Sequence, residues 1–173
     1  MRDKNINNNY SVGKEHSHTA REKINMKLEA LKDLLYVVVG AIYETHRELG
    51  PGLNEYVYQE GLEVELQEQK VYYEREKECH PTYKNKVLAA TYRLDFVCFD
   101  NIIIECKAVK KLTAEHRAQL FNYMRLTKMR AGVLVNFAKR YTEVERYFYD
   151  PETDELLTYD GKTLVFEVEE PTL

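Results

Sequence analysis

The chain has 173 residues, of which 44% are hydrophobic and 31% are charged, and it contains only 7 Gly and 4 Pro. This length and composition are typical of one soluble domain with a substantial core, and they leave no room for two full domains. No apolar run approaches the roughly 18 residues of a membrane helix, so the sequence argues against a membrane-spanning protein.

The cysteines and the amino terminus indicate a cellular compartment. Cys79, Cys98 and Cys106 show no C-x-x-C spacing, and the first residues lack the apolar stretch and cleavage site of a secretory signal. We therefore expect a cytoplasmic protein whose thiols are reduced. All three cysteines are interpreted as small strand residues, and Cys106 should point away from the face that carries Glu105 and Lys107.

The amino-terminal part is predicted to be a tail followed by two helices. Residues 1–25 are polar and aperiodic, so we expect a flexible tail. From Lys27 to about Leu49, apolar residues recur every three or four positions, which is the period of a helix. Gly50-Pro51-Gly52 should form a tight turn, and a second helix should run from Leu53 to about Gln69. Its inward residues are expected to be Val57, Leu62, Val64 and Leu66.

Three strands are expected next, in an antiparallel meander. Residues 71–83 and 87–99 are rich in Val, Tyr and Thr and are joined at Lys84-Asn85-Lys86. A turn at Asp100-Asn101 should lead into a third strand, from Ile102 to about Val109. Three consecutive isoleucines indicate that this strand is covered on both faces and is central.

The remaining elements complete an α/β sandwich with a mixed sheet. Thr113 should cap a helix from Ala114 to about Lys128, and residues 132–137 should form a short apolar strand. Residues 141–149 fit either a short helix or an edge strand, and residues 156–168 have the pattern of a hairpin around Asp160-Gly161. We expect residues 26–149 to form the domain and residues 150–173 to form an acidic hairpin extension.

Charge is distributed unevenly along a chain whose formal net charge is −4. Nine basic residues but only two acids lie between positions 105 and 140, whereas ten acids and two basic residues follow between positions 141 and 173. The basic segment suits contact with a polyanion on one face. A solvated helix face with scattered lysines is the alternative explanation.

Three charged residues on the predicted meander are the candidate site. Glu105 and Lys107 alternate onto one face of the third strand, and Asp95 lies on the strand before it. A two-residue turn at Asp100-Asn101 would send Asp95 to the opposite face, whereas a three-residue turn or a bulge would bring it to the same face. A metal site therefore requires that the carboxylates of Asp95 and Glu105 converge.

These residue types suit metal-assisted hydrolysis of a phosphodiester. Two carboxylates and a strand carbonyl match the oxygen coordination of Mg²⁺, or of Mn²⁺, and the ion can activate a bound water and neutralise phosphate charge. Lys107 could orient or deprotonate the attacking water. Acid and lysine residues also occur often on surface strands, so the motif alone is a hypothesis.

The segment Gly52-Leu53-Asn54-Glu55-Tyr56-Val57-Tyr58 resembles the G-x-x-E-x-x-Y motif of a family of small bacterial proteins that belongs to the PD-(D/E)XK nuclease-like superfamily. The resemblance extends from about Leu34 to Phe137. It implies a restriction-endonuclease-like αβββαβ core with a central mixed sheet flanked by helices. Leu94 stands where the superfamily motif has proline.

The resemblance also implies roles for individual residues. Asp95, Glu105 and Lys107 correspond to the signature residues, Glu55 to an additional metal-binding acid, and Gln119 to a polar catalytic residue. Glu55 could instead be a helix-start acid, and Gln119 could belong to an exposed helix face. Nucleic acid is the expected partner, with candidate contacts from Lys110, Lys111, Arg117 and Tyr123.

Three functions are therefore compatible with the sequence. The first is a Mg²⁺-dependent nuclease acting on DNA or RNA. The second is a non-catalytic module that binds nucleic acid or protein, and the third is an accessory subunit whose site a partner completes. A homodimer is plausible for the nuclease, because cutting both strands of a duplex requires two sites.

Overall fold

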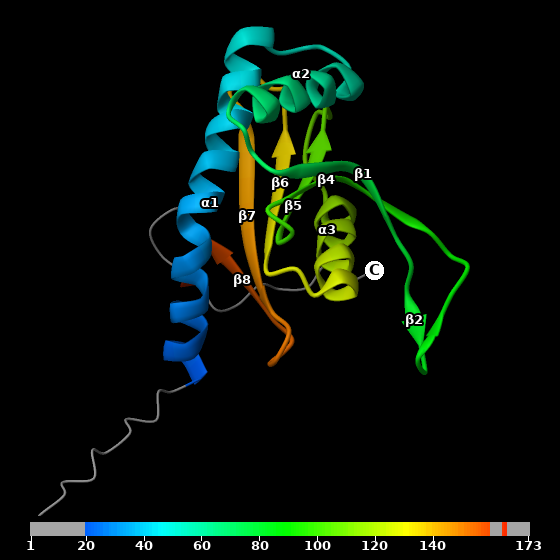
Figure 1. The fold of residues 1–173 in the computed structure, drawn as a ribbon. Helices are drawn as coiled ribbons and strands as arrows, with labels where there is room; N and C mark the ends of the chain where they lie inside the picture. The colour runs from blue at the N-terminus through cyan, green and yellow to red at the C-terminus, as the bar shows by residue number, and fades with distance from the viewer. Residues whose placement is uncertain (1–19, 160–163, 166–173) are drawn as a thin grey trace, which may run out of the picture.

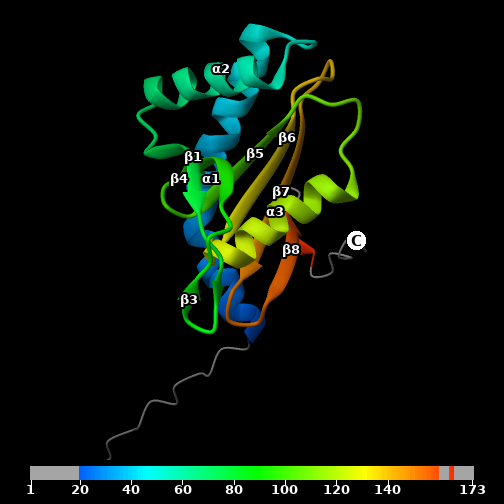
Figure 2. The same cartoon turned by 90° about the vertical axis from the view of Figure 1, so that its right-hand side faces the viewer.

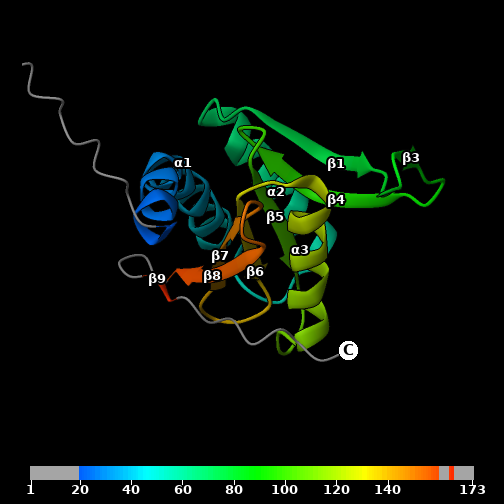
Figure 3. The same ribbon diagram turned by 90° about the horizontal axis from the view of Figure 1, so that it is seen from below.

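The computed structural model of the chain describes residues 20–159 and 164–165. A seven-stranded mixed sheet lies between helices α1 (Ala20–Leu49) and α3 (Ala114–Thr127), and α2 (Glu55–Glu68) crosses one end of the central strands (Figures 1 and 3). The expected α/β sandwich with a mixed sheet is confirmed. None of the described helices combines the length and the apolar character needed to cross a bilayer.

Helix α1 is longer than the sequence pattern predicted. It begins at Ala20, so residues 20–25, which we expected in the tail, are helical. The reason is local, because Ala-Arg-Glu-Lys at positions 20–23 are strong helix formers even without an apolar stripe. The predicted end at Leu49 is confirmed, and the rest of the predicted tail lies outside the described residues. The buried side of the helix carries Leu31, Leu35, Val38, Val39 and Ile42.

Helix α2 follows a sharp turn in which Gly50 and Gly52 have φ angles of +71° and +93°. Its buried residues, Tyr58, Leu62 and Leu66, are spaced by four and face α1 and the sheet. Val64 lies off this stripe and is 54% exposed, so the expectation that it faces inward was wrong.

The meander consists of β1 (Tyr73–Cys79), β4 (Tyr92–Cys98) and β5 (Ile102–Lys107), paired antiparallel in that order. The two long strands predicted over 71–83 and 87–99 are each interrupted. Beyond the Cys79–Tyr92 pair, the chain leaves the sheet as a separate ribbon made of β2 (Thr82–Tyr83) and β3 (Lys86–Val87). Its residues are exposed, so no core holds them in the main sheet.

Helix α3 connects β5 to β6 (Ala131–Asn136), which runs parallel to β5. Strand β7 (Glu143–Asp150) pairs antiparallel with β6. The sequence left residues 141–149 as either a short helix or an edge strand, and the structure shows that most of them form an internal strand of the sheet. Strands β8 (Glu155–Tyr159) and β9 (Leu164–Val165) pair as the predicted hairpin, while its loop and the residues after Val165 lie outside the described residues. The sheet order is β1-β4-β5-β6-β7-β8-β9.

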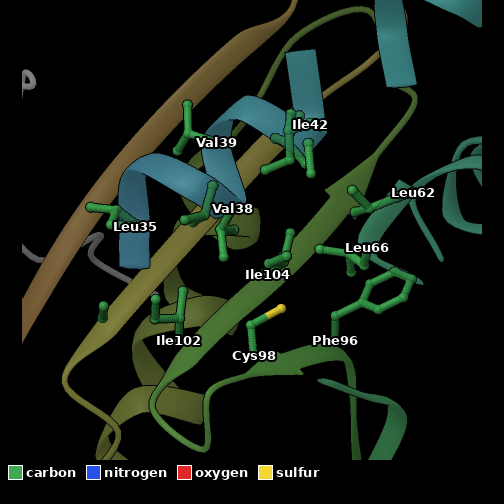
Figure 4. Packing of buried hydrophobic residues seen from close by; sticks show 14 of the residues in the cluster. Leu35, Val38, Val39, Ile42, Leu62, Leu66, Phe96, Cys98, Ile102 and Ile104 are labelled. Carbon is green, nitrogen blue, oxygen red and sulfur yellow. The ribbon is translucent and has the colours of Figure 1, made fainter. Parts of the chain in front are cut away.

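Each face of the sheet packs a hydrophobic core. The face toward α1 and α2 buries alternate residues of the central strands, including Phe96, Cys98, Ile102 and Ile104 (Figure 4). Cys106 belongs to this face, as predicted, and all three cysteines are free thiols. The face toward α3 buries a second set that comprises Leu94, Val97, Ile103, Leu120, Phe121, Met124 and Leu134. Both cores use β4, β5 and β6, which are therefore the most firmly held part of the sheet.

Candidate active site

The β4–β5 connection has three residues, which places Asp95 on the face of Glu105. The pairs Cys98–Ile102 and Phe96–Ile104 fix the register. Val97 and Ile103, which are also paired, face α3, and alternation from them directs Asp95 and Glu105 to the same side. Phe99 and Asp100 adopt left-handed conformations with φ of 52° and 56°, and the Asn101 N–H donates to the Cys98 carbonyl over 3.1 Å. The connection is therefore the three-residue turn, one of the two alternatives that the candidate metal site required.

Asp95, Glu105 and Lys107 lie close enough at the α3 face of the sheet for the charge of each to act on the others. The Cys106 N–H donates to Asp95 Oδ2 over 2.8 Å, and Lys107 Nζ donates to Glu105 Oε1 over 2.6 Å. The side chains of Glu105 and Lys107 are only 2% and 13% exposed. Glu105 Oε2 is buried and accepts no hydrogen bond from the residues that the structure describes. An unpaired buried carboxylate oxygen is costly and leaves a coordination position for a cation.

Burial and mutual repulsion raise the pKa values of both acids. Burial is the largest cause for Glu105, the charge of Asp95 adds to it, and together they outweigh Lys107 and raise the pKa of Glu105 to about 7. The pKa of Asp95 is also raised, mainly by burial, although the Cys106 N–H and Lys107 oppose the shift. Such shifts are typical of functional carboxylate pairs.

Lys107 remains a cation in this environment. Burial favours its neutral form, but attraction to Glu105, Glu55 and Asp95 outweighs burial and raises the pKa of Lys107. An ammonium with a raised pKa cannot accept a proton near neutral pH. In this arrangement Lys107 can donate hydrogen bonds and supply positive charge, and it is not poised to act as a general base.

Helix α2 brings two further polar residues to the acids. Glu55 is its first residue, and its charge raises the pKa values of both Asp95 and Glu105. Gln59, one helical turn later, hydrogen-bonds to Asp95 and lowers that pKa. Sequence reasoning missed Gln59, although its spacing of four from Glu55 places the two on one helix face.

Tyr58 holds the turn that positions Glu55. Its hydroxyl donates to the Gly50 carbonyl over 2.6 Å and accepts from the Leu53 N–H over 3.1 Å, while its ring stacks on Phe137 with centroids 4.7 Å apart. The glycine and tyrosine of the G-x-x-E-x-x-Y segment thus shape and brace the α1–α2 turn. Glu55, which lies between them in the motif, is thereby placed where its charge acts on Asp95 and Glu105.

Substitution of Tyr58 by Phe is expected to destabilise the protein by about 1–2 kcal/mol, because the ring stays packed but two partly buried backbone groups lose their partner. Thermal unfolding followed by circular dichroism measures the effect. Tyr56, two residues earlier and 61% exposed, provides the matched control, and its change to Phe should leave the midpoint within experimental error. Equal unfolding midpoints for Tyr58→Phe and wild type would show that the two hydrogen bonds of the Tyr58 hydroxyl contribute nothing to stability.

Helix α3 places Gln119 and Tyr123 beside the site. The Gln119 amide donates to the Tyr123 hydroxyl over 2.9 Å. The pKa of Tyr123 is raised mainly by burial, with contributions from the charges of Glu105 and Asp95. The amide of Gln119 is therefore held through Tyr123 at the α3 side of the acids. The helix itself starts at the predicted cap, where the Thr113 N–H donates to His116 Nδ1 over 3.1 Å.

The candidate nucleic-acid contacts differ in their surroundings. Lys110 and Lys111 are exposed in the loop that follows β5. Among the described residues, Arg117, unlike these two lysines, is engaged in an ion pair. Its guanidinium binds both carboxylate oxygens of Glu145 on β7, one of them over 2.8 Å. Its pKa is raised, first by this hydrogen-bonded pair. The structure thus gives Arg117 a bracing role between α3 and β7 that the sequence did not indicate.

Asn136 anchors the loop that carries the two lysines. It is fully buried, its amide donates to the Val109 carbonyl over 2.9 Å, and its Oδ1 accepts from the N–H groups of Val109 and Ala138 over 3.1 and 3.2 Å. One side chain therefore ties the ends of β5 and β6 together next to Lys107. No sequence motif marked this residue.

Replacing Asn136 with Ala is expected to destabilise the fold by about 2–4 kcal/mol, because three partly buried backbone groups of Val109 and Ala138 are left unpaired. Urea unfolding followed by fluorescence or circular dichroism tests this. The same change at Asn122, which is exposed on α3, should cost less than about 0.5 kcal/mol. A variant at Asn136 as stable as the one at Asn122 would contradict the proposed anchor.

The side chains present fit a hard divalent cation bound partly by water. Among residues 20–159 and 164–165, no group of three or more Asp, Glu, His or Cys side chains is arranged to hold a metal ion. Mg²⁺ commonly binds through one or two carboxylates and keeps several waters, so a pair of acids suffices. Asp95 has one oxygen not engaged by Cys106, and Glu105 has the unpartnered Oε2. These are oxygen atoms of the kind that such an ion binds.

A family model described as the PD-(D/E)XK nuclease superfamily matches residues 32–147, from within α1 to within β7. No curated protein and no solved structure gave a match. The matched region contains the meander with Asp95, Glu105 and Lys107 together with helices α2 and α3. The chain belongs to the PD-(D/E)XK nuclease superfamily.

Proposed function

We propose that the protein is a metal-dependent nuclease that hydrolyses phosphodiester bonds of DNA or RNA. The observation that carries this proposal is the pair of half-buried Asp95 and buried Glu105, with an unpartnered oxygen on Glu105 and a lysine bonded to it. Such an arrangement is costly without a cation and is suited to one. Membership of a nuclease superfamily supports the same interpretation.

Asp95 and Glu105 would hold Mg²⁺ or Mn²⁺, and Glu55 would add negative charge from α2. When bound, the ion supplies an activated water and neutralises charge on the phosphate. Lys107, a cation in the metal-free protein, donates hydrogen bonds to the attacking water or to the phosphate and stabilises the charge that develops there. Gln119, held through Tyr123, would orient the substrate or water from the α3 side.

We assign the protein to the G-x-x-E-x-x-Y group within the superfamily. Each residue of the motif has a role in the structure that supports this assignment. Gly52 adopts a positive φ in the turn, Tyr58 hydrogen-bonds to the turn, and the charge of Glu55 acts on Glu105. Lys110, Lys111 and Tyr123 would contact nucleic acid near the site, while Arg117 would do so only if its pair with Glu145 opened. A cytoplasmic location and a homodimer complete the proposal, and the free thiols are consistent with a reducing compartment.

The test is cleavage of end-labelled single-stranded, duplex, nicked and RNA substrates by the full chain. Mg²⁺ or Mn²⁺ should support cleavage of at least one substrate, EDTA should stop it, and Asp95→Asn should abolish it. Asparagine preserves the acceptor for the Cys106 N–H, so a loss of activity would reflect the missing charge and not a broken strand. Cleavage undiminished in Asp95→Asn would exclude this site. Metal binding without cleavage of any substrate would favour the non-catalytic module.

A further inference from the structure

The β2–β3 ribbon projects from the body of the protein. The segment 80–91, here named the arm, contains the two short strands, and Figures 1 and 2 show it extending away from the seven-stranded sheet. Its tip turns at Lys84 and Asn85, which have φ angles of 47° and 62°. Tyr83 and Val87 are 63% and 69% exposed. The arm therefore adds nothing to either core and presents its side chains outward.

The arm is basic in a chain that is acidic overall. No Asp or Glu occurs between positions 79 and 94, and Lys84 and Lys86 stand at the tip. Lys84 Nζ lies 5.4 Å from the centre of the Tyr83 ring, so a cation and an aromatic face are displayed together. Arg93, at the base, is paired with Glu76 over 3.3 Å and is not counted among the available cations. This combination is complementary to a polyanion that carries flat bases.

A groove connects the arm to the candidate active site. Two adjoining pockets of about 330 and 360 Å³ share Tyr92, Asn122 and Tyr123 in their walls. The first also includes Pro81 at the base of the arm, and the second includes Gln119. Tyr92 is 45% exposed and meets the Tyr123 ring edge-on, with centroids 6.0 Å apart. The groove thus runs from the arm to the residue pair beside the acids.

We propose that the arm and this groove bind a single-stranded segment of nucleic acid and lead it to the acid pair. The inference rests on the proposed function and specifies its substrate class: nucleic acid with an unpaired strand at the cleavage point. Each pocket has room for about one nucleotide. A base can therefore enter only after it has separated from the neighbouring bases on which it stacks in a duplex. Tyr92 supplies a stacking face, Asn122 supplies an amide for a base edge, and the tip lysines contact phosphates further along the strand. Among the described residues that line the two pockets, Glu115 is the one acid, and its charge disfavours phosphate there and leaves that position to a base.

Binding of fluorescein-labelled oligothymidine to the full chain, measured by anisotropy without divalent ions, tests the inference. Lys84→Ala/Lys86→Ala should weaken binding about tenfold and reduce the slope of log Kd against log salt by about 1.4, roughly 0.7 for each lost phosphate contact. Tyr92→Ala should weaken binding about tenfold, and Tyr92→Phe should restore it because the ring is retained. Binding of a blunt hairpin duplex should be weaker than that of the single strand and little affected by Tyr92→Ala.

Matched controls come from α1, on the opposite face of the sheet. Lys32→Ala/Arg47→Ala removes the same formal charge as the arm double variant, from two residues that are paired with acids of α1. Tyr36→Ala removes a ring that is 82% exposed. Both should bind oligothymidine like wild type. Equal losses in the arm and control variants would overturn the inference, as would a preference for the blunt duplex. Thermal melts of all variants identify any loss that arises from unfolding.

Failure of this inference and failure of the proposed function give different results. If wild type cleaves nucleic acid and Asp95→Asn does not, while the arm and Tyr92 variants bind and cleave as wild type does, only the arm and groove are excluded. If the arm and Tyr92 variants lose single-strand binding but no substrate is cleaved with Mg²⁺ or Mn²⁺, the inference holds for binding and the nuclease activity is excluded.

Discussion

Replacement of Lys107 by methionine is expected to lower the single-turnover cleavage rate by a factor of about 10²–10⁴ while divalent-ion binding persists. Methionine keeps much of the aliphatic volume but removes a buried cation that binds Glu105 over 2.6 Å. The charge that Lys107 offers to the reacting phosphate or water is then lost. Asp95 and Glu105 remain, and Lys107 no longer competes with a divalent ion for the carboxylate of Glu105, so the ion still binds. Rates at saturating Mn²⁺ and titration of Mn²⁺ by electron paramagnetic resonance measure the two effects separately.

Lys110 provides the matched control for this experiment. It lies three residues later, is exposed, and carries the same charge outside the acid pair. Lys110→Met should alter the affinity for nucleic acid and its salt dependence while leaving the single-turnover rate of bound substrate close to that of wild type. If Lys107→Met cleaves as fast as Lys110→Met, Lys107 has no part in the chemical step.

Glu105→Gln is expected to stabilise the metal-free protein at pH 8, although it should abolish cleavage. The pKa of Glu105 is raised to about 7, mainly by burial, from an ordinary value of 4.5. Between these pH values the folded state holds a proton that the unfolded state has released, so the stability falls as the pH rises from 4.5 to about 7 and stays at the lower level above it. Glutamine cannot ionise and avoids this loss. The expected gain at pH 8 is on the order of 2 kcal/mol, or about 4–8 °C in the unfolding midpoint.

Two comparisons make the prediction specific to this carboxylate. The gain should be much smaller at pH 5, where the native Glu105 is protonated, and added Mg²⁺ should stabilise wild type at pH 8 more than the variant. Glu143 is the control, because its pKa is lowered, first by its bond to Lys139, so Glu143→Gln should not stabilise at either pH. A Glu105→Gln protein that is less stable than wild type at pH 8 without metal would contradict the assignment of a strained, cation-binding carboxylate.

The placement of the acid pair shows how far the sequence could lead. Alternation along β5 put Glu105 and Lys107 on one face, but the position of Asp95 depended on a turn that local pattern could not determine. The structure uses three residues with Phe99 left-handed, a conformation that no sequence preference of phenylalanine predicts. The register is instead favoured by burial, because it directs Phe96, Ile102 and Ile104 into the core beneath α1 and α2.

Contacts between distant elements account for most of what the sequence did not reveal. Gln59 reaches Asp95 only because α2 crosses the end of the sheet, and Arg117 meets Glu145 only because β7 pairs with β6. The sequence did not reveal the arm, whose residues fell at the ends of two predicted strands. A segment rich in Val and Tyr favours the strand conformation equally in a separate ribbon and in the main sheet. By contrast, elements with strong local signals, such as the cap at Thr113 and the central strand β5, were predicted correctly.

The most direct test of the metal site is anomalous diffraction from crystals of the full chain soaked in MnCl₂ near pH 8, where both acids can ionise when a cation is present. The predicted result is an anomalous peak between the carboxylates of Asp95 and Glu105, with the ion contacting Glu105 Oε2, and no such peak in Asp95→Asn crystals treated identically. Well-diffracting wild-type crystals in which Mn²⁺ binds elsewhere and leaves this pair empty would contradict the central claim.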